Sequence, residues 1–157
     1  MLAKGAVHPV RPFPAQGLEP VDNPGLFWSL AFAIRRSTFQ RIGGFDERFT
    51  GYGAEDTDFG FAARDAGVPL YFLGGALACH QYHPTFDPPL QHLEDIVANA
   101  TRFREKRGFW PMAGWLDQFA ALGLVEWQDD TLGILRHPTQ RERDQAVSFW
   151  PADGSAL

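Results

Sequence analysis

The sequence predicts an α/β domain, in which apolar strands lie beside amphipathic helices. A continuously apolar run from Leu26 to Ile34 is typical of a strand that is buried on both faces. A second apolar run, Val68 to Ala78, is interrupted at Gly74-Gly75 and predicts one bulged strand or two short ones. Apolar residues at helical spacing between Leu90 and Phe103 predict a long helix that ends near Gly108.

Length, charge and cysteine content narrow the functional classes. The 157 residues, 45% of them hydrophobic, suit one globular domain. The formal net charge of -5 argues against nucleic acid as a partner. Cys79, the single cysteine, cannot form an internal disulfide, and no apolar run reaches the roughly 20 residues of a transmembrane helix. The N-terminus does not resemble a signal peptide. We therefore expect a cytoplasmic protein, associated with a membrane only through a partner or a further segment.

The first part of the chain carries clear start and stop signals. Residues 1–25 hold five of the 12 prolines and predict an extended lead-in or linker. Ser37 followed by Gln40 matches a capping box, which predicts the start of a short helix that Gly43-Gly44 ends.

Three further elements complete the expected domain. Phe59 to Ala66 has helical spacing and ends at Gly67, and a second helix is predicted from Ala113 to Leu122. Thr131 to Leu135 predicts a short strand before a polar tail. We divide the chain into the lead-in at 1–25, a functional domain at 26–125 and a C-terminal extension at 126–157.

An acidic cluster stands at the start of the helix that contains Phe59. Glu55, Asp56 and Asp58 lie where free backbone N–H groups and the helix dipole stabilise negative charge, so capping alone could explain them. The segment before them, Gly51-Tyr52-Gly53-Ala54, permits unusual backbone angles and could present an aromatic ring above a site. Together the two features favour a functional loop over a capped surface helix.

Histidines follow the second apolar run. His80 and His83 are candidate metal ligands, with Cys79 and His92 as further candidates, although hydrogen-bonded loop histidines would look the same. A zinc site from Cys79, His80 and His83 is disfavoured because adjacent ligands rarely close a tetrahedron together.

Three motifs in order resemble a known enzyme family: Phe-Ala-Ile-Arg-Arg-Ser, then Ile-Gly-Gly-Phe-Asp-Glu, then Gly-Tyr-Gly-Ala-Glu-Asp-Thr-Asp-Phe. They resemble the C-terminal half of family 2 glycosyltransferases and the related galactosyltransferase C-terminal domain. The resemblance covers Phe27 to Pro84 and extends more loosely to Leu124. It implies the C-terminal portion of a GT-A fold, with a mixed sheet and packed helices. The nucleotide-binding half and its Asp-x-Asp motif are not found before Phe27, and Asp56-Thr57-Asp58 spells that motif inside the acceptor helix instead.

The resemblance also implies roles for individual residues. Asp56 matches the base that deprotonates the attacking hydroxyl in an inverting transfer, and Glu55 matches an acceptor contact. Tyr52 matches a lid aromatic, where relatives often have tryptophan, and Gly53 and Asp58 belong to the same acceptor-binding segment. Either His83 or His80 would complete the coordination of a divalent ion, manganese or magnesium, at the diphosphate leaving group.

We therefore expect a glycosyltransferase of the hexosyltransferase type that uses a nucleotide-diphospho-sugar donor and a glycan or other hydroxyl acceptor. Alone the chain would be catalytically incomplete, as a fragment, a truncated gene product or one component of a split enzyme whose donor-binding half lies on another chain. One alternative is a noncatalytic remnant that binds a glycan or a protein. A second is a metal-dependent hydrolase that uses His80, His83 and the acidic cluster, for which no recognisable ligand set is present.

Overall fold

The computed structural model describes residues 13–76, 78 and 83–148. The chain divides into two compact units, which are described separately. The described part of unit 1 comprises residues 13–46 and 56–78 without residue 77, and that of unit 2 comprises residues 47–55 and 83–148. The chain thus passes from unit 1 to unit 2 after Asp46 and returns to unit 1 at Asp56.

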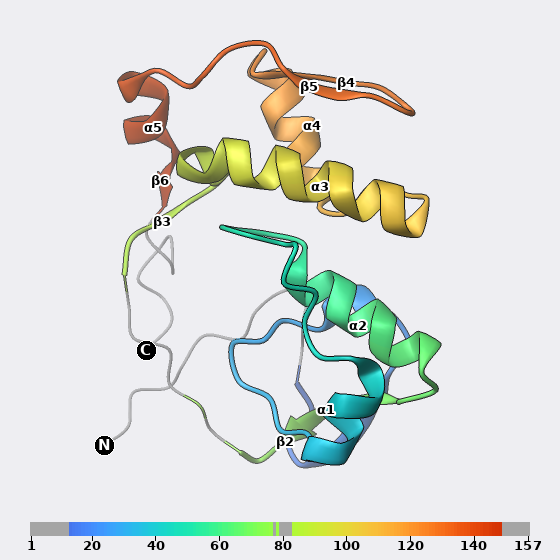
Figure 1. Cartoon of the computed structure of the whole chain (residues 1–157). Helices are drawn as coiled ribbons and strands as arrows, with labels where there is room; N and C mark the ends of the chain where they lie inside the picture. The colour runs from blue at the N-terminus through green and yellow to red at the C-terminus, as the bar shows by residue number, and fades with distance from the viewer. Residues whose placement is uncertain (1–12, 77, 79–82, 149–157) are drawn as a thin grey trace, which may run out of the picture. The chain divides into compact units, whose positions relative to one another are not determined.

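Unit 1 combines a two-stranded antiparallel sheet with two helices (Figure 1). Its elements are β1 (Gly17–Val21), the 3-10 helix η1 (Pro24–Leu26), α1 (Arg36–Ile42), α2 (Glu55–Asp65, of which Glu55 is counted with unit 2) and β2 (Leu70–Gly74). The core is a cluster of phenylalanine rings around Phe59, which is 2% exposed. The ring of Phe45 stacks on that of Phe59 at 4.5 Å, and those of Phe27 and Phe39 lie 5.1 and 5.6 Å from it. One glycine makes this packing possible, since a Cβ on Gly60 would lie 2.1 Å from the carbonyl oxygen of Pro24.

The predicted strand from Leu26 to Ile34 is wrong. Residues 27–34 form turns and irregular backbone, and Leu30 and Phe32 are 66% and 44% exposed. One reason is that the backbone N–H of Ser29 donates to the side chain of Asp56 rather than to a neighbouring strand. Phe27 and Phe32 pack against Phe59, so the apolar run serves ring packing instead of strand pairing.

Two further expectations for unit 1 need correction. The lead-in contains a strand, because β1 pairs with β2 in the register Gly17↔Gly74 to Val21↔Leu70. The capping box at Ser37 is absent, because the N-cap of α1 is Arg35, two residues earlier, and Arg35 makes no side-chain cap hydrogen bond. The predicted end of this helix is confirmed, since Gly43 has a left-handed conformation at the C-cap.

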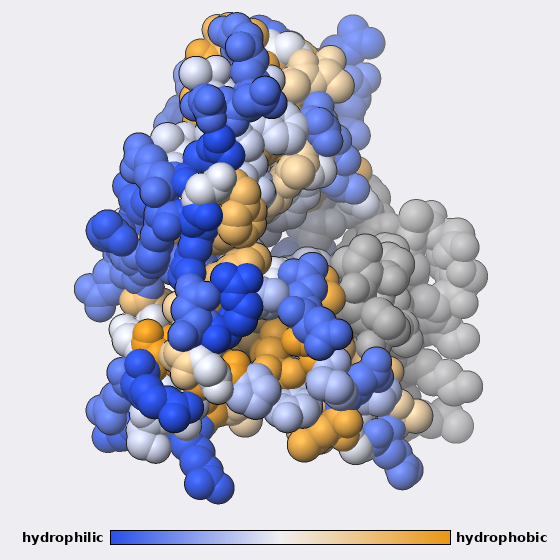
Figure 2. Space-filling model, turned by 90° about the vertical axis from the view of Figure 1, so that its right-hand side faces the viewer, coloured by the Kyte–Doolittle hydropathy of each residue, from blue (hydrophilic) through white to orange (hydrophobic). Residues whose placement is uncertain are grey.

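An apolar face of the β1–β2 ladder is exposed. Leu18 pairs with Leu73, and Pro20 with Tyr71, so all four side chains lie on one face of the ladder. Leu18, Leu73 and Tyr71 are 66%, 52% and 47% exposed. Figure 2 shows apolar side chains at the surface of the part of the molecule that holds unit 1.

Unit 2 is built around the helix α3. Its elements are β3 (Thr85–Phe86), the 3-10 helix η2 (Leu90–His92), α3 (Leu93–Arg107), α4 (Ala113–Ala121), β4 (Val125–Trp127), β5 (Leu132–Ile134), α5 (Gln140–Ala146) and β6 (Val147–Ser148). In Figure 1, α4 and the β4–β5 hairpin lie on the same side of α3. The buried face of α3 joins Leu116 and Phe119 of α4 in the core of the unit.

Local signals predicted much of unit 2 correctly. The structure confirms the long helix that ends at Gly108, the helix that starts at Ala113 and the short strand within Thr131 to Leu135. Within the predicted polar tail lies the helix α5, which was not predicted. Its N-cap Thr139 and Glu142 form a complete capping box, a signal that the sequence Thr-Gln-Arg-Glu carries.

The described residues therefore form helices and small antiparallel sheets, which are compatible with an α/β glycosyltransferase domain. The three strand pairs of this part of the chain are all antiparallel, and the mixed sheet of a GT-A fold stays a prediction. Within residues 13–76, 78 and 83–148, no helix is both long enough and apolar enough to cross a membrane.

Candidate active site

The glycine-rich loop at residues 51–54 belongs to unit 2 and has left-handed backbone angles. The φ angles of Gly51, Gly53 and Ala54 are 75°, 96° and 71°. Gly51 cannot be replaced without movement, since a Cβ there would lie 2.3 Å from the carboxyl carbon of Asp95. Ala54 has a side chain, is 4% exposed and still adopts a left-handed angle, so backbone strain accumulates directly before Glu55.

A buried asparagine on α3 holds this loop in place. Asn99 is 1% exposed, and its side-chain amide donates to the carbonyl oxygens of Thr50 at 2.9 Å and Tyr52 at 3.3 Å. Its own side-chain oxygen accepts a hydrogen bond from Arg102 at 3.0 Å. Both N–H donors of this buried amide thus bond the loop, one on each side of Gly51, and its oxygen accepts from Arg102, so the amide orients the backbone there.

Tyr52 lies flat against a histidine. Its ring stacks on the imidazole of His92 at 4.2 Å with 7° between the planes, and the ring of Trp115 lies 6.0 Å away. Tyr52 keeps 41% of its surface exposed. The Nδ1 atom of His92 lies 3.7 Å from a carboxylate oxygen of Asp95, the residue that also approaches Gly51.

In unit 1, Asp56 has two differently used carboxylate oxygens. Its Oδ2 accepts a hydrogen bond from the backbone N–H of Ser29 at 3.0 Å. Its Oδ1 is buried and has no hydrogen-bond partner among the residues that the structure describes. An unpaired buried carboxylate oxygen is unfavourable, so this atom is available for a donor supplied by a ligand.

The other predicted site residues have distinct environments. Glu55 and Asp56 are consecutive residues at the start of α2, with Glu55 half-buried, while Asp58 is 2% exposed. Gly53 lies against Met112, whose sulfur would be 3.0 Å from a Cβ at that position. Tyr52, Gly53 and Glu55 are counted with unit 2, and Asp56 and Asp58 with unit 1. The roles of these residues stay predictions.

The structure describes one of the two predicted metal ligands, His83. His83 is exposed, and its Nδ1 lies 3.1 Å from the carbonyl oxygen of Pro84. His80 and Cys79 lie outside the described residues. Within the described part of the chain, no group of three or more His, Cys, Asp or Glu residues could hold a metal ion. The described residues alone therefore do not fit a complete metal site.

Two important residues of this region were not predicted. Ser29 acts through its backbone N–H, which no side-chain motif reveals. Asn99 was detectable, because it is a polar residue on the apolar face of the predicted helix between Leu90 and Phe103.

Part of the chain matches a family of known proteins. Residues 22–83 match a family model described as the N-terminal domain of galactosyltransferase. That description names an N-terminal domain, whereas the sequence motifs resemble the C-terminal half of related enzymes, so the finer assignment stays a prediction. No solved structure matches the chain significantly.

Curated relatives are glycosyltransferases that share short regions with this chain. Validoxylamine A glucosyltransferase of Streptomyces hygroscopicus subsp. jinggangensis (strain 5008) is 43% identical over 44 residues, which are 28% of this chain and 10% of that protein. N-acetylglucosaminyl-diphospho-decaprenol L-rhamnosyltransferase of Mycobacterium tuberculosis (strain ATCC 25618 / H37Rv) is 37% identical over 78 residues, 48% of this chain and 25% of that protein. The chain therefore spans a quarter or less of the length of these relatives. Residues 22–83 are thus similar to a galactosyltransferase domain, and the chain shares regions with known glycosyltransferases.

Proposed function

We propose that this chain supplies the acceptor side of an inverting glycosyltransferase, in which Asp56 is the base. The reaction would transfer a sugar from a nucleotide-diphospho-sugar to a hydroxyl group of a glycan or another acceptor. The region that matches the galactosyltransferase family, residues 22–83, contains both Asp56 and Ser29. The names of the relatives, a glucosyltransferase and a rhamnosyltransferase, support sugar transfer as the reaction class.

The observation that carries the proposal is the asymmetry of the Asp56 carboxylate. The Ser29 N–H orients the group through Oδ2, and no described residue donates a hydrogen bond to Oδ1. A base must be held in one orientation and must keep one oxygen for the proton that it accepts. Because Oδ1 is buried, the atoms that cover it must move when an acceptor hydroxyl approaches.

Glu55 and Tyr52 have supporting roles in this proposal. Glu55 is the neighbour of Asp56 in α2, and its carboxylate would accept a hydrogen bond from a second hydroxyl group of the acceptor substrate. Tyr52 keeps an exposed ring at the end of a loop that Asn99 anchors, and it would cover the sugar and exclude water. Gly53 and Asp58 belong to the same proposed acceptor-binding segment.

A divalent ion, manganese or magnesium, belongs to the proposal as a group that would neutralise the departing diphosphate. Of the two candidates, only His83 is described, and the described residues do not form a complete site with it. We therefore assign no step to the ion. The chain spans a quarter or less of its relatives, and we propose that the donor-binding part of the enzyme completes both the metal and the nucleotide sites.

The base assignment is tested with Asp56→Asn in an assembly that includes a donor-binding part. Loss of the base should lower turnover by at least about 100-fold, because general base catalysis contributes roughly 10²–10⁴-fold. Binding of the nucleotide sugar, measured by calorimetry, should be unchanged. Asp65→Asn is the matched control, because Asp65 lies at the other end of α2 and pairs with Arg64. Unchanged turnover in Asp56→Asn would exclude Asp56 as the base.

The half-enzyme proposal has its own test. Manganese and a panel of nucleotide sugars are titrated into the purified chain, with and without candidate partner chains. We expect donor binding only when the partner is present. Donor binding by the chain alone would contradict the half-enzyme proposal, and glycan binding without transfer in every assembly would favour the noncatalytic alternative.

A further inference from the structure

We propose that unit 2 contains a separate binding cleft for a neutral, hydroxyl-rich sugar, between the start of α3 and the segment that includes α5. The cleft has a volume of about 300 Å³, which is at the lower end of the range for small-molecule sites. The polar residues that line it are Gln91, His92, Glu94, Asp95, His137 and Arg143. All of them lie outside the family match at residues 22–83, so that match assigns them no role.

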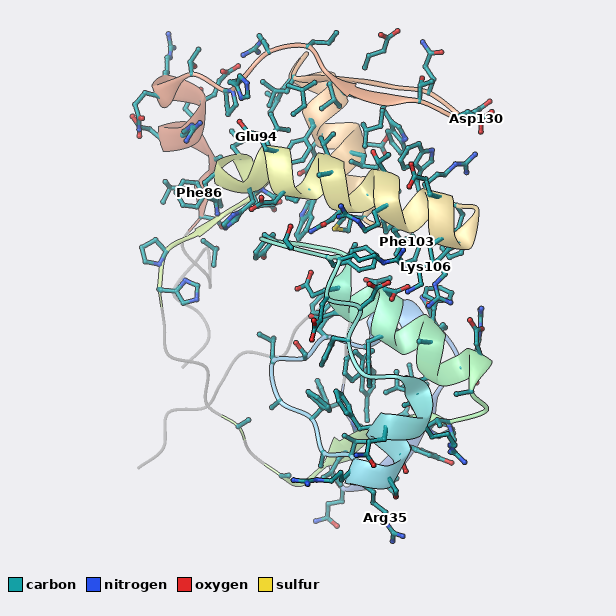
Figure 3. The ribbon with its side chains drawn as sticks, in the orientation of Figure 1. Arg35, Phe86, Glu94, Phe103, Lys106 and Asp130 are labelled. Atoms are coloured by element: carbon teal, nitrogen blue, oxygen red, sulfur yellow. The ribbon has the colours of Figure 1, made fainter. Side chains whose placement is uncertain are left out.

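The two walls of the cleft are joined by a contact between a carboxylate and a histidine. Nδ1 of His137 lies 3.4 Å from Oε1 of Glu94, and Figure 3 shows Glu94 at the N-terminal end of α3, beside the segment that leads from β5 to α5. His92 lines the same cleft and is held in orientation on one side by the ring of Tyr52 and on another by Asp95. The cleft thus has positioned polar walls.

One lining side chain has unused hydrogen-bond donors. The described part of the chain offers no side-chain or backbone partner to the guanidinium group of Arg143, which is half-buried. The guanidinium group carries five N–H donors and no acceptor. Arg143 therefore presents donors on one side of the cleft, while Glu94 and Asp95 present acceptors on the other.

This mixture of charges selects the class of ligand. Glu94 and Asp95 carry negative charge and Arg143 carries positive charge, so an ion of either sign meets a like charge as well as an opposite charge in the cleft. A neutral molecule with several hydroxyl groups can donate to the carboxylates and accept from the guanidinium group at once. The identification of this ligand as a glycan rests on the proposed function, because a glycan acceptor is the hydroxyl-rich substrate of a glycosyltransferase. The cleft itself does not depend on that function.

The probes are methyl β-galactoside, methyl β-glucoside and methyl β-N-acetylglucosaminide, with inorganic phosphate as a competing class. Binding to the purified chain is measured by saturation-transfer NMR. We expect at least one glycoside to bind, and Arg143→Ala to weaken that binding at least fivefold. Arg141→Ala is the matched control, because Arg141 is exposed on the same helix and does not line the cleft.

Several outcomes would overturn the proposal. These are binding of none of the glycosides, equal losses in Arg143→Ala and Arg141→Ala, or binding of phosphate in place of sugar. If thermal melting shows that Arg143→Ala is unfolded, Glu94→Gln replaces it, and unchanged sugar binding in that variant would contradict the site. If the chain binds a glycoside but no assembly transfers a sugar, the proposed function is refuted and the proposal of the binding cleft stands.

Discussion

At the scale of single residues, the loop at 51–54 depends on glycine at position 51 for two reasons. The φ angle of 75° is unfavourable for any residue with a Cβ, and a Cβ there would overlap the carboxylate of Asp95. The overlap adds a second cost, because the carboxylate would have to leave its position near His92.

We predict that Gly51→Ala destabilises the protein by about 1–3 kcal/mol, the range for strained backbone positions. Urea denaturation measures this free energy of unfolding. Gly108→Ala is the control, because Gly108 has a similar φ of 82° and nothing within 4 Å of the added Cβ. Equal losses in the two variants would show that the contact with Asp95 has no energetic effect.

Asn99 provides a second prediction at this scale. Asn99→Ala should cost about 1–3 kcal/mol, because it leaves the carbonyl oxygens of Thr50 and Tyr52 without their side-chain donor. The better helix propensity of alanine opposes this loss by only about half a kcal/mol. Thermal unfolding monitored by circular dichroism measures the difference. Thr101→Ala, two residues along α3, should change stability little, since its hydroxyl only bonds back to Val97.

At the scale of elements, the helices of unit 2 are stabilised in different ways. α3 has six buried residues, while α5 has only Ala146 buried. The start of α5 relies instead on a polar network, in which Glu142 accepts from the Thr139 backbone N–H at 2.7 Å and from Arg136 at 2.7 Å. The stability of α5 should therefore depend on pH more strongly than the stability of α3.

The hydrogen bond from Arg136, followed by that from the Thr139 backbone, lowers the pKa of Glu142 to about 2. The pKa in the folded state is therefore below the ordinary value of 4.5, and the stabilisation is complete above pH 4.5 and is lost as the pH falls toward 2. We predict that Glu142→Gln removes this part of the acid sensitivity. A carbon-detected NMR titration should give Glu142 a midpoint near 2, and Arg136→Ala should raise that midpoint toward 4.5. A midpoint near 4.5 in the unsubstituted chain would contradict the network.

At the scale of the whole molecule, each unit has its own hydrophobic core. Phe59 is central to the ring cluster of unit 1, and Phe119 is fully buried in the core of unit 2. Since local openings follow such cooperative groups, the two cores should respond separately to substitution.

We predict that Phe119→Leu accelerates amide hydrogen exchange in α3 and α4, and that Phe59→Leu accelerates it in α2. Each substitution should cost about 1–2 kcal/mol, because it removes part of a buried ring. Mass spectrometry of proteolytic fragments locates the change. Acceleration across both units in either variant would show that the chain unfolds as one cooperative body.

Sequence patterns predicted the elements that local chemistry determines. The helix that contains Phe59, the helix that ends at Gly108 and the helix at Ala113 were all predicted, because periodic apolar residues and terminal glycines act within a few residues. The run from Leu26 to Ile34 was misread, since a continuous apolar stretch suits any buried conformation. The motif at residues 51–58 singled out the candidate site through its resemblance to a glycosyltransferase family, because its residue types alone are also explained by helix capping.

The sequence by itself thus determined the helices α2, α3 and α4, the acidic segment and the resemblance to glycosyltransferases, all of which depend on neighbouring residues. Only the tertiary structure decided the partners of that segment. Ser29 reaches Asp56 across 27 positions, and Asn99 reaches Thr50 across 49. The physical reason is that such hydrogen bonds form only after distant parts of the chain have packed, and no local pattern records which donor will meet which acceptor.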